Sequence, residues 1–280
     1  MSTSGLDGAG GGLARGFAPG RPSLVAYLMA GYPDRERSLE AMRVVVDAGA
    51  DVIELGVPYA DPLADGPVIR DAAEAARAGN PGGFGLAETI DLAGEFIGRA
   101  KRSRTPVPPI ALMTYLNPIM RMGYPAAAER MRMAEVAGVI VPDMPPDSAG
   151  PWLAAAAGID TVFLAAPTST PERLALVGER SSGFVYCVST TGVTGERADL
   201  PSDLTGLVAR VKASTGLPVA VGFGVSTPLQ ASLVAGIADG VVVGSAIVRR
   251  QADPGALSAF VRELARAVHA SGRGARTGAV

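Results

Sequence analysis

Eight short apolar runs recur along the chain, and this repetition restricts the fold more than any other feature of the sequence. Most of the runs are continuously apolar, which is typical of parallel strands that are buried on both faces. The runs are Leu24–Met29, Val52–Leu55, Ile110–Thr114, Val139–Val141, Thr161–Leu164, Phe184–Val188, Val219–Val221 and Gly240–Val243.

The segments between these runs have helical periodicity. One of them carries apolar residues at Leu39, Met42 and Val45, with Pro33-Asp34 before the pattern and Gly49 after it. A capping residue at the start and a glycine at the end are the usual limits of a helix. Eight βα units in about 250 residues favour a (β/α)8 TIM barrel, an α/β fold, over an open doubly wound sheet. The open sheet stays the alternative, because strand counts from one sequence are easily wrong by one or two.

We expect a single domain between two tails. Residues 1–20 are rich in glycine and predict a disordered N-terminal leader, residues 21–269 form the barrel, and residues 270–280 predict a disordered C-terminal tail. The leader has no apolar core of the kind that a signal peptide needs. No apolar run approaches the roughly 20 residues that cross a bilayer. The sequence therefore predicts a cytoplasmic protein.

The composition narrows the chemistry. A formal net charge of −2 gives no basic field to attract nucleic acid or an anionic membrane surface. The chain has one cysteine, Cys187, and one histidine, His269, so a disulfide framework, a zinc site and a Ser-His-Asp system are all disfavoured. We expect no bound metal. Proton transfers would have to come from carboxylates, lysine or tyrosine.

A carboxylate interrupts the second apolar run. Glu54 stands among Val52, Ile53 and Leu55, where burial would raise its pKa toward neutral pH and make it a proton donor and acceptor. The alternative is a buried glutamate paired with another polar group of the core. Asp61 and Asp65 follow in a loop, where an aspartate is more often a cap or turn residue than a catalytic one. Their position near Glu54 strengthens the case for a catalytic role.

Three glycine-containing turns follow the last three runs. They are Gly192–Gly195, Gly222–Ser226 and Gly244-Ser245. Glycine lets backbone N–H groups approach a phosphate closely, and the loops after strands seven and eight are a recurrent phosphate site of this fold. A short helix that begins after Gly244 would point its N-terminus at the anion.

The sequence resembles the tryptophan synthase alpha chain family. The stretch from Glu54 to Pro67, Glu-Leu-Gly-Val-Pro-Tyr-Ala-Asp-Pro-Leu-Ala-Asp-Gly-Pro, is similar to the signature of that family. The resemblance extends in order over about residues 22 to 265. It also includes Ala30–Pro33, Leu112–Pro118, Val141–Pro145, Ala166–Thr168, Ser189–Gly195, Gly222–Gly224 and Gly244-Ser245.

The resemblance implies a reaction and a set of site residues. The family cleaves indole-3-glycerol phosphate to indole and glyceraldehyde 3-phosphate in tryptophan biosynthesis. Glu54 would move the proton, Asp65 would stabilise positive charge on the indole nitrogen, and Tyr186 would lie beside Glu54. A core aromatic is the alternative for Tyr186. The resemblance also implies an indole pocket and a phosphate site, formed by Tyr27, Tyr115 and Leu164 and by Gly195, Gly224, Gly244 and Ser245 respectively.

The resemblance also implies a partner. The family works as an α2β2 assembly in which indole passes to the β subunit, so pyridoxal phosphate is expected on that chain and no cofactor on this one. The residues expected in the mobile loop and at the interface are Asp61, Asn117, Pro118 and Thr194. This sequence departs from the family at Thr190, where an arginine is usual. That change bears on loop closure, not on the cleavage step.

Three other readings stay open. The chain could be a stand-alone lyase with the same residues, or a non-catalytic subunit that only regulates a partner. The presence of both Glu54 and Asp65 speaks against the second of these. A different phosphate-binding barrel would share the glycine turns but not the stretch from Glu54 to Pro67.

Overall fold

The strands of the computed structural model form one parallel sheet that closes on itself. The structure describes residues 12–62, 65–188, 203–222 and 224–271. The strands in these ranges are β1 (Ser23–Met29), β2 (Val52–Gly56), β3 (Ile110–Met113), β4 (Gly138–Ile140), β5 (Asp160–Val162), β6 (Leu164–Ala165), β7 (Val185–Val188), β8 (Val219–Gly222) and β9 (Gly240–Val243). Their order in the sheet is β5-β4-β3-β2-β1-β9-β8-β7-β6.

The two ends of this order are consecutive in the chain, and this closes the barrel. Only Phe163 separates β5 from β6; β5 pairs with β4 and β6 pairs with β7. The run expected at Thr161–Leu164 as one strand is therefore two short ones that change pairing partner at Phe163. Counted as one interrupted strand, they give the eight strands that the sequence predicts, and the predicted TIM-barrel fold is confirmed.

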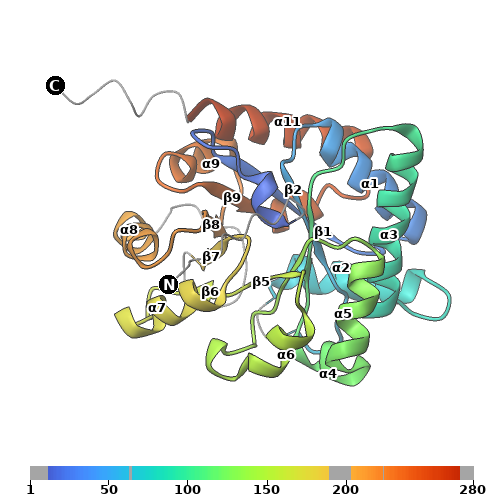
Figure 1. Cartoon of the computed structure of the whole chain (residues 1–280). Helices are drawn as coiled ribbons and strands as arrows, with labels where there is room; N and C mark the ends of the chain where they lie inside the picture. The colour runs from blue at the N-terminus through green and yellow to red at the C-terminus, as the bar shows by residue number, and fades with distance from the viewer. Residues whose placement is uncertain (1–11, 63–64, 189–202, 223, 272–280) are drawn as a thin grey trace.

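Helices surround the strands on all sides (Figure 1). They are α1 (Arg35–Asp47), α2 (Pro67–Gly79), α3 (Leu86–Ser103), α4 (Leu116–Met122), α5 (Tyr124–Met133), α6 (Gly150–Ala155), α7 (Pro171–Arg180), α8 (Leu204–Ser214), α9 (Pro228–Ala235), α10 (Ser245–Val248) and α11 (Pro254–Ser271), with short 3-10 helices η1 (Leu13–Gly16) and η2 (Pro146–Ser148). No helix within the described ranges is long and apolar enough to cross a bilayer.

Local sequence sets the limits of α1 as predicted. The Asp34 carboxylate accepts a hydrogen bond from the Arg37 N–H at 2.9 Å, which satisfies one of the free donors of the first turn. Gly49 follows the helix with φ +103°, a conformation that glycine adopts without steric cost. Leu39 and Met42 are buried on the face that packs toward the strands.

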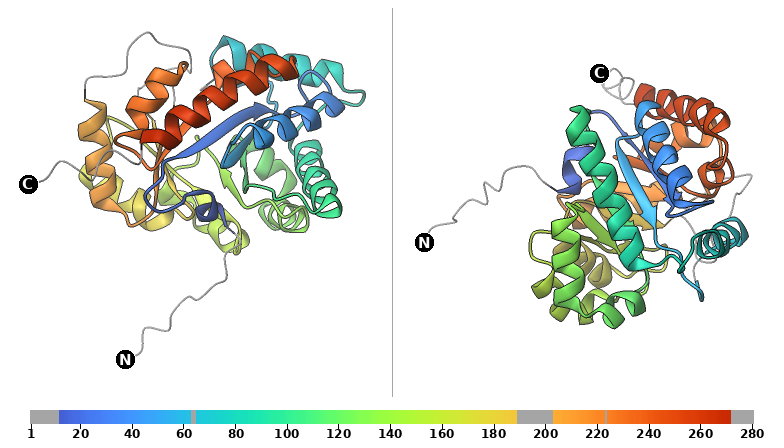
Figure 2. Two further views of the ribbon diagram at one scale, coloured as in Figure 1. Left: turned by 90° about the horizontal axis from the view of Figure 1, so that it is seen from above. Right: turned by 90° about the vertical axis from the view of Figure 1, so that its right-hand side faces the viewer.

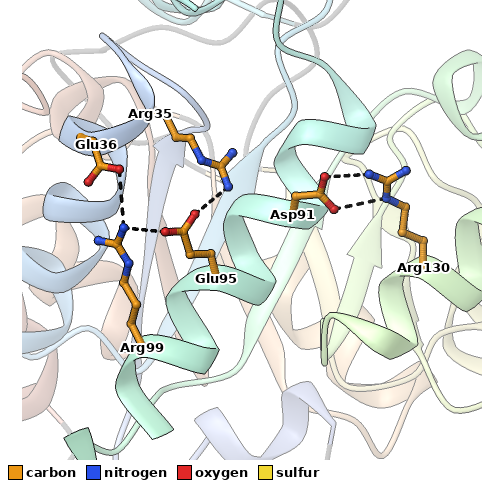
Figure 3. A network of polar contacts seen from close by, with 6 residues as sticks. All are labelled: Arg35, Glu36, Asp91, Glu95, Arg99 and Arg130. Carbon is orange, nitrogen blue, oxygen red and sulfur yellow. Dashed lines mark hydrogen bonds and ion pairs between the residues drawn. The ribbon is translucent and has the colours of Figure 1, made fainter. Parts of the chain in front are cut away.

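Ion pairs link three outer helices on one side of the barrel (Figure 3). They join α1 to α3 and α3 to α5. Each pair is partly exposed to solvent, so each contributes little to stability. The contacts are Arg35–Glu95 at 2.7 Å, Arg99–Glu36 at 3.5 Å, Arg99–Glu95 at 2.5 Å and Arg130–Asp91 at 2.7 Å.

The segment before β1 is part of the core, which differs from the expectation for residues 1–20. Leu13 in η1 is fully buried, and its N–H donates to the Asp160 carboxylate at 2.7 Å. A Cβ on Gly138 would lie 2.4 Å from Leu13 Cδ1, so the absence of a side chain on β4 makes room for the leucine. Leu13 and Gly16 are therefore buried parts of the structure, while residues 18–20 are exposed. Residues 1–11 lie outside the described residues.

Asp51, just before β2, contacts residues from both ends of the described chain: Arg21 before β1 and His269 in α11. Its carboxylate accepts from the Leu24 N–H at 2.8 Å, lies 2.7 Å from His269 Nε2 and pairs with Arg21. Burial raises the pKa of Asp51, but the hydrogen bonds from His269 and Leu24 and the charges of His269 and Arg21 outweigh it, so the pKa lies below its usual value. Helix α11 extends to Ser271, beyond the predicted start of the tail at 270. Residues 272–280 lie outside the described residues.

Replacing Leu13 by alanine should destabilise the protein although the residue lies near the chain terminus. Loss of a fully buried leucine leaves a cavity and costs about 2–5 kcal/mol of unfolding free energy. Leu229→Ala is the matched control, because Leu229 is 72% exposed. Urea unfolding followed by circular dichroism measures both. Equal midpoints for the two variants would mean that Leu13 is not part of the core.

Replacing Asp51 by asparagine should lower stability at neutral pH by about 1–3 kcal/mol, since it removes a charged hydrogen-bond acceptor from a partly buried site. Because the folded-state pKa of Asp51 is lowered, its contribution is complete above the unfolded value of about 4 and is lost as the pH falls through the folded value. The difference between wild type and variant should therefore narrow in acid. Thermal melts from neutral to acid pH, with exposed Asp47→Asn as control, measure it. A stability difference between wild type and Asp51→Asn that does not change with pH would contradict the lowered pKa of Asp51.

Candidate active site

Inward-facing side chains of β1, β2 and β7 meet at the carboxyl end of the barrel. Tyr27 and Glu54 are register partners on adjacent strands, so both point into the barrel. Glycines on neighbouring strands make space for the tyrosine rings. A Cβ on Gly56 would lie 2.0 Å from the Tyr27 hydroxyl, and a Cβ on Gly222 would lie 2.3 Å from the Tyr186 hydroxyl. No other residue type fits at these two glycine positions without moving a tyrosine.

Glu54 is a buried carboxyl group with an unusual electrostatic environment. It is 1% exposed, and among the described residues its Oε2 atom has no hydrogen-bond partner. Burial raises the pKa of Glu54 to about 8, and the negative charge of Asp65 adds to the effect. At neutral pH the group is therefore mostly protonated. Such a carboxyl group is suited to donate a proton and to take one back.

Asp65 is placed by α2. It directly precedes Gly66, the residue before the first turn of that helix, and α2 lies at the end of the barrel opposite η1 (Figure 2, right). The apolar face of α2, which includes Ile69 and Ala73, packs with Tyr27. The position of Asp65 therefore depends on how α2 docks on the end of β1.

Asp65 differs from Glu54 in its surroundings. Burial raises the pKa of Asp65 to about 6, while a hydrogen bond from the Tyr115 hydroxyl and the charge of Arg70 lower it. The carboxylate is thus mostly ionised at neutral pH. The site combines a neutral carboxyl group with a neighbouring anion, and opposite protonation states of this kind allow one group to act as an acid and the other as an electrostatic stabiliser.

The predicted tyrosines lie around this pair. Burial and the charges of Asp65 and Glu54 raise the pKa of Tyr27 well above its usual value, and the pKa of Tyr186 is raised in the same way. Both hydroxyls are therefore neutral over the whole physiological range. Leu164 is half-buried and is the register partner of Tyr186 across β6 and β7, so it faces the same interior.

Two of the predicted glycine turns lie at the ends of adjacent strands. Gly224 follows β8 with φ +85°, and Gly244 with Ser245 stands at the start of α10, the short helix that the sequence predicts there. A Cβ on Gly244 would lie 3.9 Å from Tyr27, which places this turn beside the tyrosines. The third turn, with Gly195 and Thr194, lies outside the described residues, as does Thr190.

The residues expected at a partner interface lie on two neighbouring loops. Asp61 is exposed in the segment after β2, and Asn117 and Pro118 are in the first turn of α4. Two residues near them were missed by the sequence analysis. Tyr59 accepts a hydrogen bond from Asn117, and Arg70 acts on Asp65 from one turn into α2. Tyr59 lies within the stretch from Glu54 to Pro67 that resembles the family signature, and this position could have pointed to it. No feature of the sequence pointed to Arg70.

Other chemistry-bearing residues lie apart from this site. Cys187 is buried on β7, and burial raises the pKa of its thiol to about 12, so it is not reactive at neutral pH. His269 is at the opposite end of the barrel with Asp51. Within the described part of the chain, no group of three or more histidines, cysteines or carboxylates is placed to hold a metal ion.

Comparison with known proteins identifies the fold and the family that the sequence predicts. The family model for tryptophan synthase alpha chain matches residues 13–270. A tryptophan synthase alpha chain of Mycobacterium avium is 46% identical over 255 residues, which is 89% of each chain. That of Burkholderia pseudomallei is 45% identical over 259 residues, or 90% of this chain and 93% of its own.

Solved structures agree with the sequence comparison. A structure of Mycobacterium tuberculosis tryptophan synthase superposes with a TM-score of 0.81 at 44% identity, covering 89% of this chain and 93% of the other. A tryptophan synthase subunit alpha of Legionella pneumophila gives 0.78 at 33% identity, with 88% and 92% covered. The range that the family model matches contains Glu54, Asp65 and Tyr186. With its barrel, its glycine turns and these relatives, the chain belongs to the tryptophan synthase alpha chain family.

Proposed function

We propose that this chain is a carbon–carbon lyase that cleaves indole-3-glycerol phosphate to indole and D-glyceraldehyde 3-phosphate in L-tryptophan biosynthesis. The observation that carries the proposal is the pair Glu54 and Asp65, one carboxyl mostly protonated and the other mostly ionised at the same end of the barrel. Membership of the family supports the same reaction.

The reaction is a retro-aldol cleavage, and it needs a place for the electrons of the breaking bond. Protonated Glu54 donates to C3 of the indole ring, which turns the ring into an iminium that accepts those electrons. The Glu54 carboxylate then takes the proton of the glycerol hydroxyl next to the ring as the carbon–carbon bond breaks and the aldehyde forms. The carboxyl group ends in its starting state, so the proposed step balances without a metal or organic cofactor on this chain.

Asp65 stabilises the positive charge that develops on the indole nitrogen. An anion held in place before the reaction stabilises such a charge without rearranging, which makes it effective in a partly desolvated site. Tyr186 supplies a neutral hydroxyl beside Glu54. The rings of Tyr27 and Tyr115 and the side chain of Leu164 line the space for the indole.

Backbone groups bind the substrate phosphate. Gly224, Gly244 and Ser245 follow β8 and β9, so they belong to loops at the same end of the barrel. Gly195, the fourth residue of the proposed phosphate site, lies outside the described residues. Their N–H groups would hold the anion by local geometry. The formal net charge of −2 makes a general attraction of anions by the whole chain unimportant.

The partner in this proposal is a tryptophan synthase β subunit in an α2β2 assembly in the cytoplasm. Asp61, Asn117, Pro118 and Thr194 would face it, and indole released here would pass to it. Pyridoxal phosphate would belong to the β subunit. The exposed position of Asp61 and Asn117 supports this placement.

The deciding experiment measures indole release from indole-3-glycerol phosphate by the purified chain, alone and with a tryptophan synthase β subunit. Slow release that rises sharply with the β subunit is expected. Fast release that the β subunit does not change would favour a stand-alone lyase. No release in either condition would contradict the proposal and leave a regulatory role.

Glu54→Gln should lower kcat by at least about 100-fold, because the amide keeps the shape of the side chain but transfers no proton. KM should stay within about threefold of wild type, since substrate binding rests on other groups. Glu263→Gln, an exposed position on α11, is the control. Steady-state kinetics of indole release measure both. A Glu54→Gln variant with near wild-type kcat would remove Glu54 from the proton-transfer role.

The pH profile of kcat/KM should be bell-shaped, with limbs near pH 6 and pH 8. Activity falls as Asp65 gains its proton below about 6 and as Glu54 loses its proton above about 8. Asp65→Asn should lower activity less than Glu54→Gln, because the amide keeps the shape. It should also move the basic limb to lower pH, since the repulsion that raises the pKa of Glu54 is removed. An unmoved basic limb would show that the two carboxyl groups do not interact.

A further inference from the structure

Tyr59 connects two loops at the carboxyl end of the barrel. It follows β2 in the segment that leads to Asp65, and its hydroxyl accepts a hydrogen bond from Asn117 Nδ2 at 2.9 Å. Asn117 lies in the first turn of α4, where the Leu116 N–H in turn donates to the Asp143 carboxylate at 2.8 Å. The loops after β2 and β3 are thus joined by side chains through a tyrosine that is only half-buried.

The ring of Tyr59 also contacts the residue that holds Asp65. Its centroid is 5.2 Å from that of Tyr115, with an angle of 31° between the planes. Tyr115 is 7% exposed, and its hydroxyl donates a hydrogen bond to the Asp65 carboxylate. The contacts form a continuous series from Asn117 at the surface through Tyr59 and Tyr115 to Asp65.

We propose that Tyr59 is a positioning residue for Asp65. Its hydroxyl, held by Asn117, keeps its ring packed against Tyr115, and Tyr115 in that position donates to the Asp65 carboxylate. Without the Asn117 bond, the Tyr59 ring is free to turn toward solvent, and Tyr115 loses the neighbour that covers it. The hydrogen bond to Asp65 is then made less often. The kinetic consequence rests on the proposed lyase function; the structural link does not.

The pKa of Asp65 distinguishes this positioning role from a general loss of stability. A hydrogen bond from a hydroxyl favours the ionised form of a carboxylate, so weakening it raises the pKa of Asp65. Tyr59→Phe leaves in place the titratable groups, among the described residues, that interact with Asp65. These groups are Glu54 on β2, Arg70 on α2, Tyr27 on β1 and Tyr186 on β7.

The experiment uses the whole chain without any partner. Carboxyl-labelled aspartate gives NMR titration curves, and the spectrum of Asp65→Asn assigns the signal of Asp65. The midpoint for Asp65 should rise in Tyr59→Phe and stay at the wild-type value in Tyr124→Phe. Tyr124 is a suitable control because it lies on α5 and packs against Trp152, with ring centroids 5.9 Å apart. An unchanged midpoint in Tyr59→Phe overturns the proposal.

Kinetics of indole release test the consequence for the reaction. Tyr59→Phe should lower kcat about fivefold, which corresponds to about 1 kcal/mol, with KM within about twofold and the acid limb moved to higher pH. If wild type releases no indole, the lyase function fails and the titration still decides the link. If wild type is active and the kcat of Tyr59→Phe equals that of Tyr124→Phe, the positioning role is overturned.

A double-mutant cycle tests whether the two side chains act through one bond. Asn117→Ala should raise the titration midpoint of Asp65 by the same amount as Tyr59→Phe. The double variant should raise it no further, because either single change already removes the bond. Shifts that add would show that Asn117 and Tyr59 act separately, which would overturn the series of contacts proposed here.

Discussion

The removal of water from one carboxyl group governs the arrangement of this site. Glu54 points into the barrel from β2, where its charged form loses the hydration that a surface carboxylate keeps. An ionised glutamate with one unpartnered oxygen would be costly there, and the neutral form is the stable one at pH 7. Among the described residues, the groups that interact with it include the neutral hydroxyls of Tyr27 and Tyr186 and the carboxylate of Asp65, which lies just before α2. The proton-transfer chemistry follows from this environment.

The fold could be predicted because its information is local and repeated. Continuous apolar runs marked the strands to within a residue or two, as at Ser23–Met29 for the predicted Leu24–Met29. The break at Phe163 had no such signal. It arises because one strand must pair with β4 on one side and β7 on the other, a demand of barrel closure that no short stretch of sequence records.

The same contrast separates the parts of the site that the sequence predicts from those it does not. Glu54 was visible as a charge in an apolar run, and Asp65 lay in a recognised stretch. Leu13 was not visible, because a single leucine among glycine and arginine has no periodicity; its burial depends on the space at Gly138. Tyr59 was missed for a related reason. Its contacts with Asn117 and Tyr115 join segments far apart in the sequence.

The close approach of Tyr27 to Gly56 and of Tyr186 to Gly222 constrains how this sequence can vary. Each tyrosine hydroxyl occupies the place where a Cβ would stand on the next strand. A methyl group at either glycine is compatible with the barrel only if the facing tyrosine becomes smaller as well. The two members of each pair are therefore expected to change together among homologues or not at all. Such covariation between neighbouring strands would be a record of steric complementarity, independent of any direct role in catalysis.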